Sequence, residues 1–354
     1  MKIERLEVVP FALPFKEPYV TARGRLEERE LVLVRLRGDG IEGLGETTSL
    51  SLRKGAPLAA ITRELSERGT ALLEGATVEP EGWWAQAESL AGAGLSREAL
   101  AALDVALLDL AGKLSGEPAW KLLGAAEAKP VRCNATLVAG EPSKVAEDAL
   151  TWAERGFETF KLKVGVEDDV EQVASVRAAL GEPASLRVDA NGVWDVAEAV
   201  GKLKRMAPLE LAEQPVATLE EMAALRLRTG VSLAADESVA TSEDARRAVP
   251  ACDAATVKLA KVGGVRASLE IARWLPVYLS SALDGPIGIA AAGHAAQALP
   301  GPYAHGLATA LLFGESIASR ECGLAGDRLV LPDAPGLGVE IDERALERFR
   351  ITVE

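Results

Sequence analysis

The chain has 354 residues, 48% of them hydrophobic and 26% charged, so it can bury a large core and is long enough for one big domain and an accessory one. Its 39 Lys and Arg against 53 Asp and Glu give a net charge of −14, which disfavours nucleic acid and anionic membranes as partners. Cys133, Cys252 and Cys322 are scattered and include no Cys-x-x-Cys pair, which argues against a disulfide framework and a structural zinc site. With no signal-peptide pattern and no membrane-spanning run, the sequence predicts a cytoplasmic protein.

His294 and His305 are the only two histidines of the sequence, and this scarcity disfavours reactions that rely on imidazole groups. They are too few for a zinc site built mainly from histidine. A Ser-His-Asp triad is disfavoured because no Gly-x-Ser-x-Gly motif supplies its serine. Phosphoryl transfer on a P-loop is disfavoured because the chain has no Gly-x-x-x-x-Gly-Lys-[Ser/Thr] motif.

The first 120 or so residues predict an α+β region. A helical apolar period indicates helices at 56–73 and 96–114, the second with Ser96 as its N-cap. Alternating apolar residues indicate strands, which are expected at 2–9, 30–36 and 41–45.

From about residue 130, short apolar strands that are each followed by a helical stretch recur at intervals of 22 to 28 residues. They are expected at 131–137, 159–164, 185–190, 209–214, 231–236, 254–260, 276–281 and 304–309. Eight such βα units predict an α/β fold with a closed TIM-type (β/α) barrel, and an open doubly wound sheet is the structural alternative. The predicted division is an α+β domain at 1–125, a barrel at 126–318 and a tail at 319–354 that folds back on the first domain.

The second expected strand carries two lysines of one parity, Lys161 and Lys163. The apolar residues between and around them would pack under the helices, which directs both lysines into the barrel. Two ammonium groups in one space disfavour each other's protonation, as does burial, so at least one lysine is expected to have a lowered pKa and to serve as a base. The alternative is a solvated edge strand, for which a closed barrel has no place.

The third, fourth and fifth strands end in the acids Asp189, Glu213 and Asp236. Because neighbouring strands lie about 4.8 Å apart, three carboxylates at matching heights converge, and they repel one another unless a cation binds between them. Carboxylate oxygens with no thiol or imidazole nearby favour Mg²⁺, with Mn²⁺ as a substitute. Each acid alone is equally well explained as a helix N-cap, whereas the three in register favour the metal site.

The sixth strand ends at Lys258, and Lys261 follows one turn later. Around the barrel, lysines therefore flank the three acids from opposite sides. With a substrate carboxylate bound to the metal, Lys163 would lie near one face of the α-carbon and Lys258 near the other. This layout suits proton abstraction beside a carboxylate. Lys261 is expected to be a surface charge of the following loop.

Five short motifs occur in order along the chain: Lys-x-Lys at 161–163, Asp-x-Asn at 189–191, Glu-Gln-Pro from 213, Asp-Glu-Ser from 236 and Lys-x-x-Lys-x-Gly-Gly from 258. Together they resemble the muconate lactonizing enzyme subgroup of the enolase superfamily, over essentially the whole chain. The resemblance implies that the N-terminal region and the tail form a capping domain, whose loops near 21–28 and 47–52 cover the barrel mouth and select the substrate. The seventh strand ends without a histidine, which fits the mandelate racemase and enolase branches poorly.

One catalytic frame serves muconate cycloisomerisation, o-succinylbenzoate synthesis, N-acylamino acid racemisation and dipeptide epimerisation in this subgroup. Dipeptide epimerases usually carry Asp-x-Asp at the end of the eighth strand, where this chain reads HGLATALLF. The runs at 134–136, 280–288 and 302–309 are similar to those of o-succinylbenzoate synthases of menaquinone biosynthesis. The resemblance therefore implies a Mg²⁺-dependent lyase acting on a small-molecule carboxylate.

By this resemblance the substrate is 2-succinyl-6-hydroxy-2,4-cyclohexadiene-1-carboxylate, which loses water. Lys163 would remove the α-proton and then protonate the departing hydroxyl, Lys161 would lower the pKa of Lys163, and Lys258 would stabilise the enediolate. Substrate contacts are expected at Asn134, Asn191, Ser281 and Gly285. Backbone N–H groups near Gly285 would hold the succinyl carboxylate.

Several of these expectations have alternatives. Ser281 is as well explained as an N-cap, and Asn191 as a structural residue. Arg187 shares the parity of Asp189 and needs an anionic partner that the sequence does not identify, and His305 is expected to be a packed core residue. The rival enzyme is an N-acylamino acid racemase with two opposed lysine bases, and the non-enzyme rival is a barrel retained as a binding module. A homo-oligomer is compatible with the resemblance.

Overall fold

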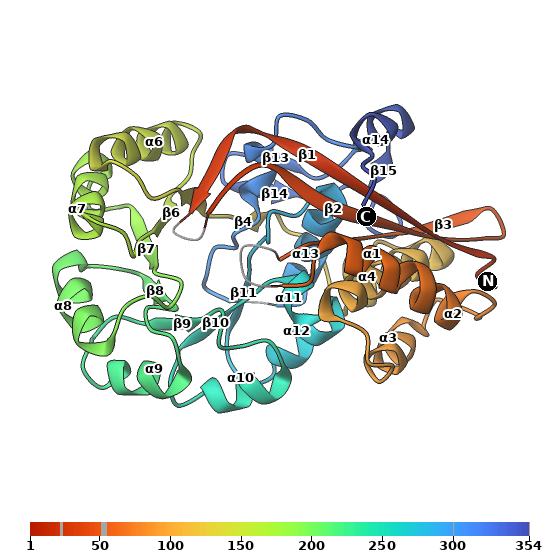
Figure 1. The fold of residues 1–354 in the computed structure, drawn as a ribbon, viewed down its shortest axis with the longest axis horizontal. Coiled ribbons are helices and arrows are strands. Elements are labelled where there is room, and N and C mark those ends of the chain that lie inside the picture. The colour runs from red at the N-terminus through yellow and green to blue at the C-terminus, as the bar shows by residue number, and fades with distance from the viewer. Residues whose placement is uncertain (22–23, 51–54, 300, 354) are drawn as a thin grey trace.

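The computed structural model describes residues 1–21, 24–50, 55–299 and 301–353. Figure 1 shows a long N-terminal hairpin with orange helices beside it, an arc of alternating strands and helices, and a blue C-terminal tail that returns to the N-terminal part. None of the helices in these ranges combines the length and the apolar character needed to cross a membrane.

The N-terminal region begins with an antiparallel sheet in the order β1-β2-β3. Its strands are β1 (Arg5–Thr21), β2 (Gly24–Gly38) and β3 (Ile41–Thr48). The first two strands are much longer than expected from the apolar alternation. Pro10 and Pro14 are tolerated because β1 is the edge strand of this sheet. The backbones of both face the outer edge, where their carbonyls accept N–H groups from Ile351 and Gly314 and no N–H of their own is needed.

Helices pack against this sheet, and the central one confirms the helix expected at 96–114. They are α1 (Leu58–Glu64), the π-helical turn η2 (Leu65–Gly69), α2 (Thr70–Leu73), α3 (Trp83–Ala91), α4 (Arg97–Ser115) and α5 (Ala119–Leu122). Ser96 is the N-cap of α4, and its hydroxyl accepts the N–H of Ala99 at 3.3 Å. Helix α4 lies close to β3 because Gly45 has no side chain: a Cβ there would lie 2.0 Å from the carbonyl oxygen of Ala102.

Seven parallel strands form a curled sheet in the order β5 to β11. They are β5 (Ala135–Leu137), β6 (Thr159–Lys163), β7 (Ser185–Asp189), β8 (Leu211–Glu213), β9 (Leu233–Ala235), β10 (Ala254–Val257) and β11 (Val277–Leu279). His305 pairs with Cys133 beside β5, and Gly306 pairs with Ser280 beside β11, so this segment joins the two edges. The TIM-type barrel is thus confirmed and the open-sheet alternative is wrong.

Three expected barrel strands differ in detail. The sixth, expected at 254–260, ends at Val257 because a helix begins at Leu259. The first divides into β4 (Val131–Arg132) and β5, with β4 pairing outside the barrel with β14 (Arg328–Val330). The eighth, expected at 304–309, is reduced to the two single bridges, because the 3₁₀ helix η3 (Ala308–Leu312) begins directly after them.

Helices surround the barrel strands on the outside (Figure 1). They are α6 (Pro142–Glu154), α7 (Asp169–Leu180), α8 (Val196–Met206), α9 (Leu219–Arg226), α10 (Ser242–Ala248), α11 (Leu259–Val262), α12 (Val265–Ile271) and α13 (Pro286–Gln297). Two of them start with capping boxes, Thr218 with Glu221 at α9 and Thr241 with Asp244 at α10. Such boxes satisfy the free N–H groups of a first turn and define where each helix begins.

The tail consists of β12 (Ala318–Arg320), β13 (Gly323–Ala325), β14, β15 (Glu340–Ile341) and α14 (Glu343–Phe349). It contacts the N-terminal sheet in two ways. Arg35 on β2 makes a 2.8 Å ion pair with Glu343, and Phe11 on β1 forms a β-bridge with Arg350. The tail therefore ties the N-terminal sheet to the end of the barrel.

Two buried acids, Glu46 on β3 and Asp104 on α4, connect the N-terminal region to barrel helices, and we call them the interface carboxylates. Glu46 accepts the N–H groups of Gly285 at 2.7 Å and Gly288 at 3.2 Å, at the start of α13. Asp104 accepts the N–H of Val265 at 2.5 Å, at the start of α12. Each acid therefore occupies the positive end of a helix that belongs to the other part of the molecule.

Burial changes the proton affinity of both interface carboxylates. Burial, with a smaller repulsion from Asp284, raises the pKa of Glu46 to about 8. Burial likewise raises the pKa of Asp104 to about 7, although the backbone N–H groups of α12 oppose the shift. The amide donors thus compensate only part of the cost of placing each charge in the interior.

Candidate active site

A pocket lies where the barrel strands end and the N-terminal sheet approaches them. Its described lining residues are Tyr19, Arg29, Leu50, Thr136, Lys161, Lys163, Asn191, Lys258, Ser280, Ser281, Ala282, Leu283 and Thr309. Lys161 and Lys163 both face this space, as the parity of β6 predicts, and the solvated-strand alternative is wrong because both are buried. The first three lining residues belong to β1, β2 and the segment after β3, so the N-terminal domain caps the barrel.

Three buried acids converge beside this pocket, and we call Asp189, Glu213 and Asp236 the active-site carboxylates. Asp189 and Glu213 are register partners on β7 and β8, while Asp236 directly follows β9. One ligand oxygen of each lies within 4.8 Å of the others, so the three could hold a metal ion. The donor set fits a hard divalent cation, because it consists of carboxylate oxygens without thiol or imidazole.

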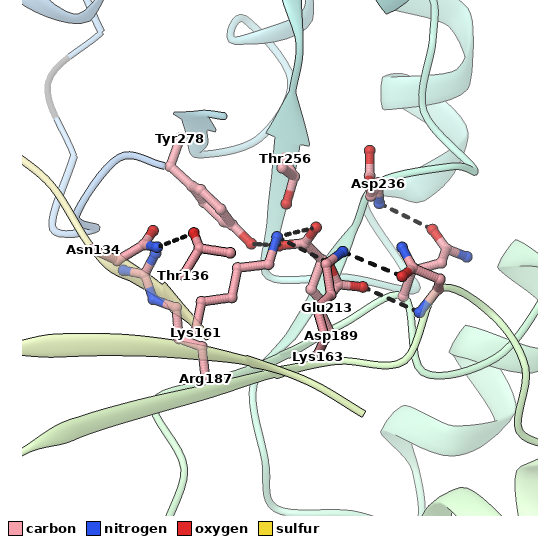
Figure 2. Close-up of polar contacts among 12 residues, drawn as sticks. Asn134, Thr136, Lys161, Lys163, Arg187, Asp189, Glu213, Asp236, Thr256 and Tyr278 are labelled. Atoms are coloured by element: carbon pink, nitrogen blue, oxygen red, sulfur yellow. Dashed lines mark hydrogen bonds and ion pairs between the residues drawn. The ribbon is translucent and has the colours of Figure 1, made fainter. Parts of the chain in front are cut away.

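Lysine ammonium groups contact every one of the active-site carboxylates, and Figure 2 shows those of Lys161 and Lys163 beside Asp189 and Glu213. Lys161 Nζ lies 2.7 Å from Glu213 and 2.9 Å from Asp189. Lys163 Nζ lies 2.6 Å from Asp189, and Lys258 makes an ion pair with Asp236. Cations therefore reach the acids from β6 on one side and from the end of β10 on the other.

These contacts shift the pKa values of the groups involved. Burial opposes the charged form of Lys161, but the attraction of Asp189, Glu213 and Asp236 outweighs it and raises the pKa of Lys161. The same balance lowers the pKa of Asp189, because Lys161 and Lys163 outweigh its burial. Burial and the charge of Asp189 raise the pKa of Glu213. Lys161 is therefore not a lysine with the lowered pKa that was expected of at least one of the pair, because the acids opposite outweigh the second lysine.

Lys261 is not the surface charge expected from the sequence. Its ammonium lies 2.8 Å from Asp236 Oδ1 and 2.5 Å from the carbonyl oxygen of the same residue, and its side chain is 11% exposed. Helix α11 begins directly after Lys258, and one turn of it carries Lys261 back toward Asp236. The motif spacing therefore places two cations, not one, on this acid.

The strand ends that carry the acids continue in unusual backbone conformations. Asn191 has φ 51° and Gln214 has φ 36°, both in the left-handed region that few residues other than glycine adopt. Asn191 Oδ1 accepts from Lys163 at 3.2 Å, and its Nδ2 donates to Glu237 at 3.1 Å. Gln214 Oε1 accepts the N–H of Asp236 at 2.9 Å, which joins the ends of β8 and β9. Sequence reasoning missed Gln214, although its place beside an acidic strand end marked it.

Three of the expected substrate contacts, Ser281, Asn134 and Gly285, differ in whether they line the pocket. Ser281 lines the pocket, and its hydroxyl also accepts the N–H of Asp284 at 2.7 Å, so it stabilises its own turn. Asn134 is absent from the described lining, and its Nδ2 donates to the carbonyl of Ala135 at 2.9 Å, at the start of β5. Gly285 donates its N–H to Glu46, so a carboxylate of the chain already takes the position expected for the succinyl group. Asn134 and Gly285 therefore lie outside the described lining, and their roles as substrate contacts stay predictions.

The partner of Arg187 is Glu210, at 2.5 Å from Nε, and Nη1 donates to the carbonyl of Ala304 at 2.7 Å. His305 is a packed core residue, as expected: burial lowers its pKa to about 4, and its Nδ1 accepts the N–H of Leu279 at 3.0 Å. Both side chains therefore belong to the interior of the barrel below the pocket.

Two of the described capping-domain residues that line the pocket, Tyr19 and Arg29, lie just outside the loops expected from the sequence. Arg29 is buried, and its Nη2 donates to the carbonyl of Ala282 at 2.7 Å. The capping loops expected at 21–28 and 47–52 lie partly outside the described residues, at 22–23 and 51–52. Leu50, which lies within the second expected loop, lines the pocket, whereas Tyr19 and Arg29 line it from positions beside the first. No sequence pattern marks these residues, because they meet the barrel only through the tertiary fold.

Comparison with known proteins identifies the class of this barrel and then the subgroup. Residues 144–345 match the family model described as "Enolase C-terminal domain-like", and residues 4–124 match "Mandelate racemase / muconate lactonizing enzyme, N-terminal domain". A barrel with acids on three consecutive strands and this capping domain is that of enolase-superfamily enzymes. The chain belongs to the muconate lactonizing enzyme subgroup of this superfamily.

Relatives with several activities are similar to the chain. The L-Ala-D/L-Glu epimerase of Clostridium acetobutylicum is 30% identical, over 96% of this chain and 99% of that one. Muconate cycloisomerase 1 of Pseudomonas putida is 31% identical, over 98% of each. The o-succinylbenzoate synthase of Mycobacterium tuberculosis is 41% identical over 218 residues, which are 58% of this chain and 65% of that one.

Solved structures agree with this assignment. Muconate lactonizing enzyme from Pseudomonas fluorescens, complexed with muconolactone, superposes with a TM-score of 0.93 at 31% identity over 99% of both chains. The N-succinyl Arg/Lys racemase from Bacillus cereus superposes with a TM-score of 0.94 at 25% identity over 99% of both chains. Fold and frame are thus shared by enzymes with different reactions, so the reaction has to be argued from the site.

Proposed function

We propose that the chain is an o-succinylbenzoate synthase, which removes the proton α to the carboxylate of 2-succinyl-6-hydroxy-2,4-cyclohexadiene-1-carboxylate and eliminates water. The charge of the pocket carries the substrate class of this proposal, a molecule with two carboxylates. Arg29, Lys161, Lys163 and Lys258 line the pocket, and no acid is among the described lining residues. Such a lining suits a substrate with two carboxylates, one beside the reacting carbon and one on the succinyl arm.

Two further observations support this reaction over dipeptide epimerisation. A dipeptide carries an ammonium group that needs an acid, and Thr309 lines the pocket in the segment where dipeptide epimerases usually have Asp-x-Asp. The o-succinylbenzoate synthase of Mycobacterium tuberculosis is 41% identical in the aligned part, against 30% for the epimerase and 31% for the cycloisomerase. The alignments with the epimerase and the cycloisomerase cover nearly the whole chain, whereas the alignment with the synthase covers 218 residues. The higher identity therefore favours the synthase only within those 218 residues.

In the proposed reaction, Lys163 removes the α-proton and then, as an ammonium group, protonates the departing hydroxyl on the same face. Its position supports both steps, since Asp189 and Asn191 orient its amine at the pocket wall. Lys161 lies beside it on β6, where its positive charge stabilises the negative charge that develops on the substrate. Lys258, from the end of β10, stabilises negative charge on the substrate from the opposite side.

The active-site carboxylates would hold Mg²⁺, with Mn²⁺ as a substitute. When bound, the ion supplies positive charge that stabilises the negative charge developing on the substrate carboxylate. The lysines that contact these acids have flexible four-carbon side chains, so their amines can move aside without a change in the backbone. Asp189, Glu213 and Asp236 are held by the rigid ends of β7, β8 and β9, which keeps the acids in place during such a change.

A second candidate is an N-succinylamino acid racemase, favoured by the lysines on opposite sides of the pocket. In that reaction Lys163 and Lys258 would act as two bases, each on one face of the α-carbon. The similarity to the solved N-succinyl Arg/Lys racemase supports the same candidate. Its substrates also carry two carboxylates, so the charge of the pocket fits both reactions.

One experiment separates the two reactions. The protein is incubated with Mg²⁺ in D₂O, in one series with the cyclohexadiene substrate and in the other with N-succinyl amino acids. We expect rapid formation of the aromatic product and slower α-deuteration of the amino acids. Fast deuteration with negligible dehydration would overturn the synthase in favour of the racemase. Neither reaction, together with no heat of Mg²⁺ binding, would favour a barrel that acts only as a binding module.

A further inference from the structure

Tyr278 contacts one of the active-site carboxylates from below the pocket. It lies on β11 and is completely buried, and its hydroxyl donates a hydrogen bond to Glu213 Oε2 at 2.7 Å. Figure 2 shows the side chain reaching from its own strand toward Glu213 in the barrel interior. Because β8 and β11 are separated by two strands, this contact crosses the barrel rather than following the sheet.

The ring of Tyr278 is held in place by its neighbours. The guanidinium of Arg187 lies 4.9 Å from the ring centroid, and the ring of Tyr303 lies 5.7 Å away. Arg187 is itself fixed by Glu210 and by the carbonyl of Ala304. The phenol therefore cannot swing away from Glu213 without disturbing a packed layer of the barrel.

The hydrogen bond from Tyr278 differs in kind from the other contacts of Glu213. Lys161 approaches the same carboxylate at 2.7 Å as a cation and competes with any metal ion for its negative charge. A phenol hydroxyl is neutral and engages one lone pair only, so it leaves the remaining lone pairs of the carboxylate available. A donor of this kind fixes the plane of a ligand and does not compete with the ion.

We propose that Tyr278 is a positioning residue for the metal centre: it orients the carboxylate of Glu213 toward Asp189 and Asp236 and so increases the affinity for Mg²⁺. The inference rests on the metal site of the proposed function. It is independent of whether the reaction is dehydration or racemisation, because both use the same three acids.

Tyr278→Phe tests the inference, because it keeps the ring and its packing on Arg187 and removes only the hydroxyl. We expect Mg²⁺ to bind about tenfold more weakly by isothermal titration calorimetry, as is typical when the hydrogen-bond partner of a metal ligand is removed. The matched control is Tyr303→Phe. That ring also lies against Arg187, at 5.7 Å, and its hydroxyl makes no hydrogen bond to the three acids among the described residues. Its Mg²⁺ affinity should equal that of the wild type.

A second measurement keeps the test valid if Tyr278→Phe is less stable. The melting temperature is recorded with and without Mg²⁺, and the increase caused by Mg²⁺ should be smaller in Tyr278→Phe than in the wild type and in Tyr303→Phe at equal Mg²⁺ concentration. If the wild type binds Mg²⁺ and Tyr278→Phe binds it within twofold, Tyr278 is only a packing residue and the inference is overturned. If the wild type itself binds no Mg²⁺, the proposed function fails first, so the two failures are distinguishable.

Discussion

Two groups of buried acids in this molecule are stabilised in different ways. The active-site carboxylates Asp189, Glu213 and Asp236 contact lysine ammonium groups from two sides of the barrel. The interface carboxylates Glu46 and Asp104 accept backbone N–H groups at the starts of α13 and α12. All five are nearly inaccessible to solvent, so the kind of partner, and not burial, distinguishes the two groups.

The difference in partners corresponds to a difference in what each group can do. An ammonium group sits on a flexible side chain and can be replaced by another cation, so the active-site carboxylates are suited to binding a metal ion and exchanging protons. A backbone N–H is fixed by the helix that contains it, so the interface carboxylates are suited to holding one part of the chain against another. Three substitutions test this comparison, and they are ordered here from the largest expected effect to the smallest.

Lys163→Ala should have the largest effect, and on turnover rather than on folding. Loss of the general base is expected to lower kcat for the preferred substrate by about 10³-fold. Steady-state kinetics with saturating Mg²⁺ measures this, and circular dichroism checks the fold. Lys202→Ala is the matched control, because Lys202 pairs with Asp169 at 2.7 Å on the outer helices. If Lys163→Ala keeps more than a tenth of the wild-type kcat, Lys163 is not the base.

Asp189→Asn should have the next largest effect, on stability in a buffer without divalent ions. The substitution takes a negative charge away from two buried ammonium groups, those of Lys161 and Lys163, and is expected to reduce the free energy of unfolding by about 3 kcal/mol. Urea denaturation at pH 8 with EDTA measures it. Asp104→Asn is the comparison from the interface, where the amide oxygen still accepts the N–H of Val265 and a charge disfavoured by burial is removed, so no loss of stability is expected. Equal losses in the two variants would contradict the proposed distinction.

Much of the site could be predicted from sequence because the barrel imposes a simple geometry. Alternation along β6 is enough to direct Lys161 and Lys163 to one side, and the regular βα interval brings Asp189 and Glu213 into register on adjacent strands. These relations depend only on positions within a strand and on the order of strands. They therefore follow from residue types and spacing along the chain.

The remaining features depend on contacts between parts that are distant in sequence. Glu46 occupies the helix start that was expected to bind the succinyl carboxylate, and it comes from a strand 239 residues away. Lys261 turns back to Asp236 because α11 begins immediately after β10, and the pattern did not mark that short helix. Tyr278 reaches Glu213 across the barrel, which spacing along one strand does not express. Tertiary packing decides these three contacts, and no local pattern encodes them.

Glu46→Gln should have the smallest effect near pH 5, where the folded chain keeps this carboxyl protonated, and its pH dependence is more informative than that size. The pKa of Glu46 is raised to about 8 in the folded chain, against an ordinary value of 4.5. Between these values the unfolded chain loses this proton while the folded chain keeps it, so the stability contributed by this group is complete below pH 4.5 and is lost as the pH rises to 8. One such group changes the free energy of unfolding by at most about 1.4 kcal/mol per pH unit. The glutamine variant should therefore lose less stability than the wild type over this interval.

Urea midpoints measured at pH 5, 6, 7 and 8 test this expectation. The curves of wild type and Glu46→Gln should diverge as the pH rises, with the variant relatively more stable at each step. The pKa of Asp104 is about 7, so below that pH this residue changes the free energy of unfolding with pH equally in both proteins. The difference between the two curves therefore reports Glu46 alone. The matched control is Glu4→Gln at an exposed position, whose curve should run parallel to the wild type. If the curve of Glu46→Gln also runs parallel to the wild type, the N–H groups of α13 compensate the buried charge of Glu46 fully. The interface carboxylates and the active-site carboxylates would then not differ in how well their charges are compensated.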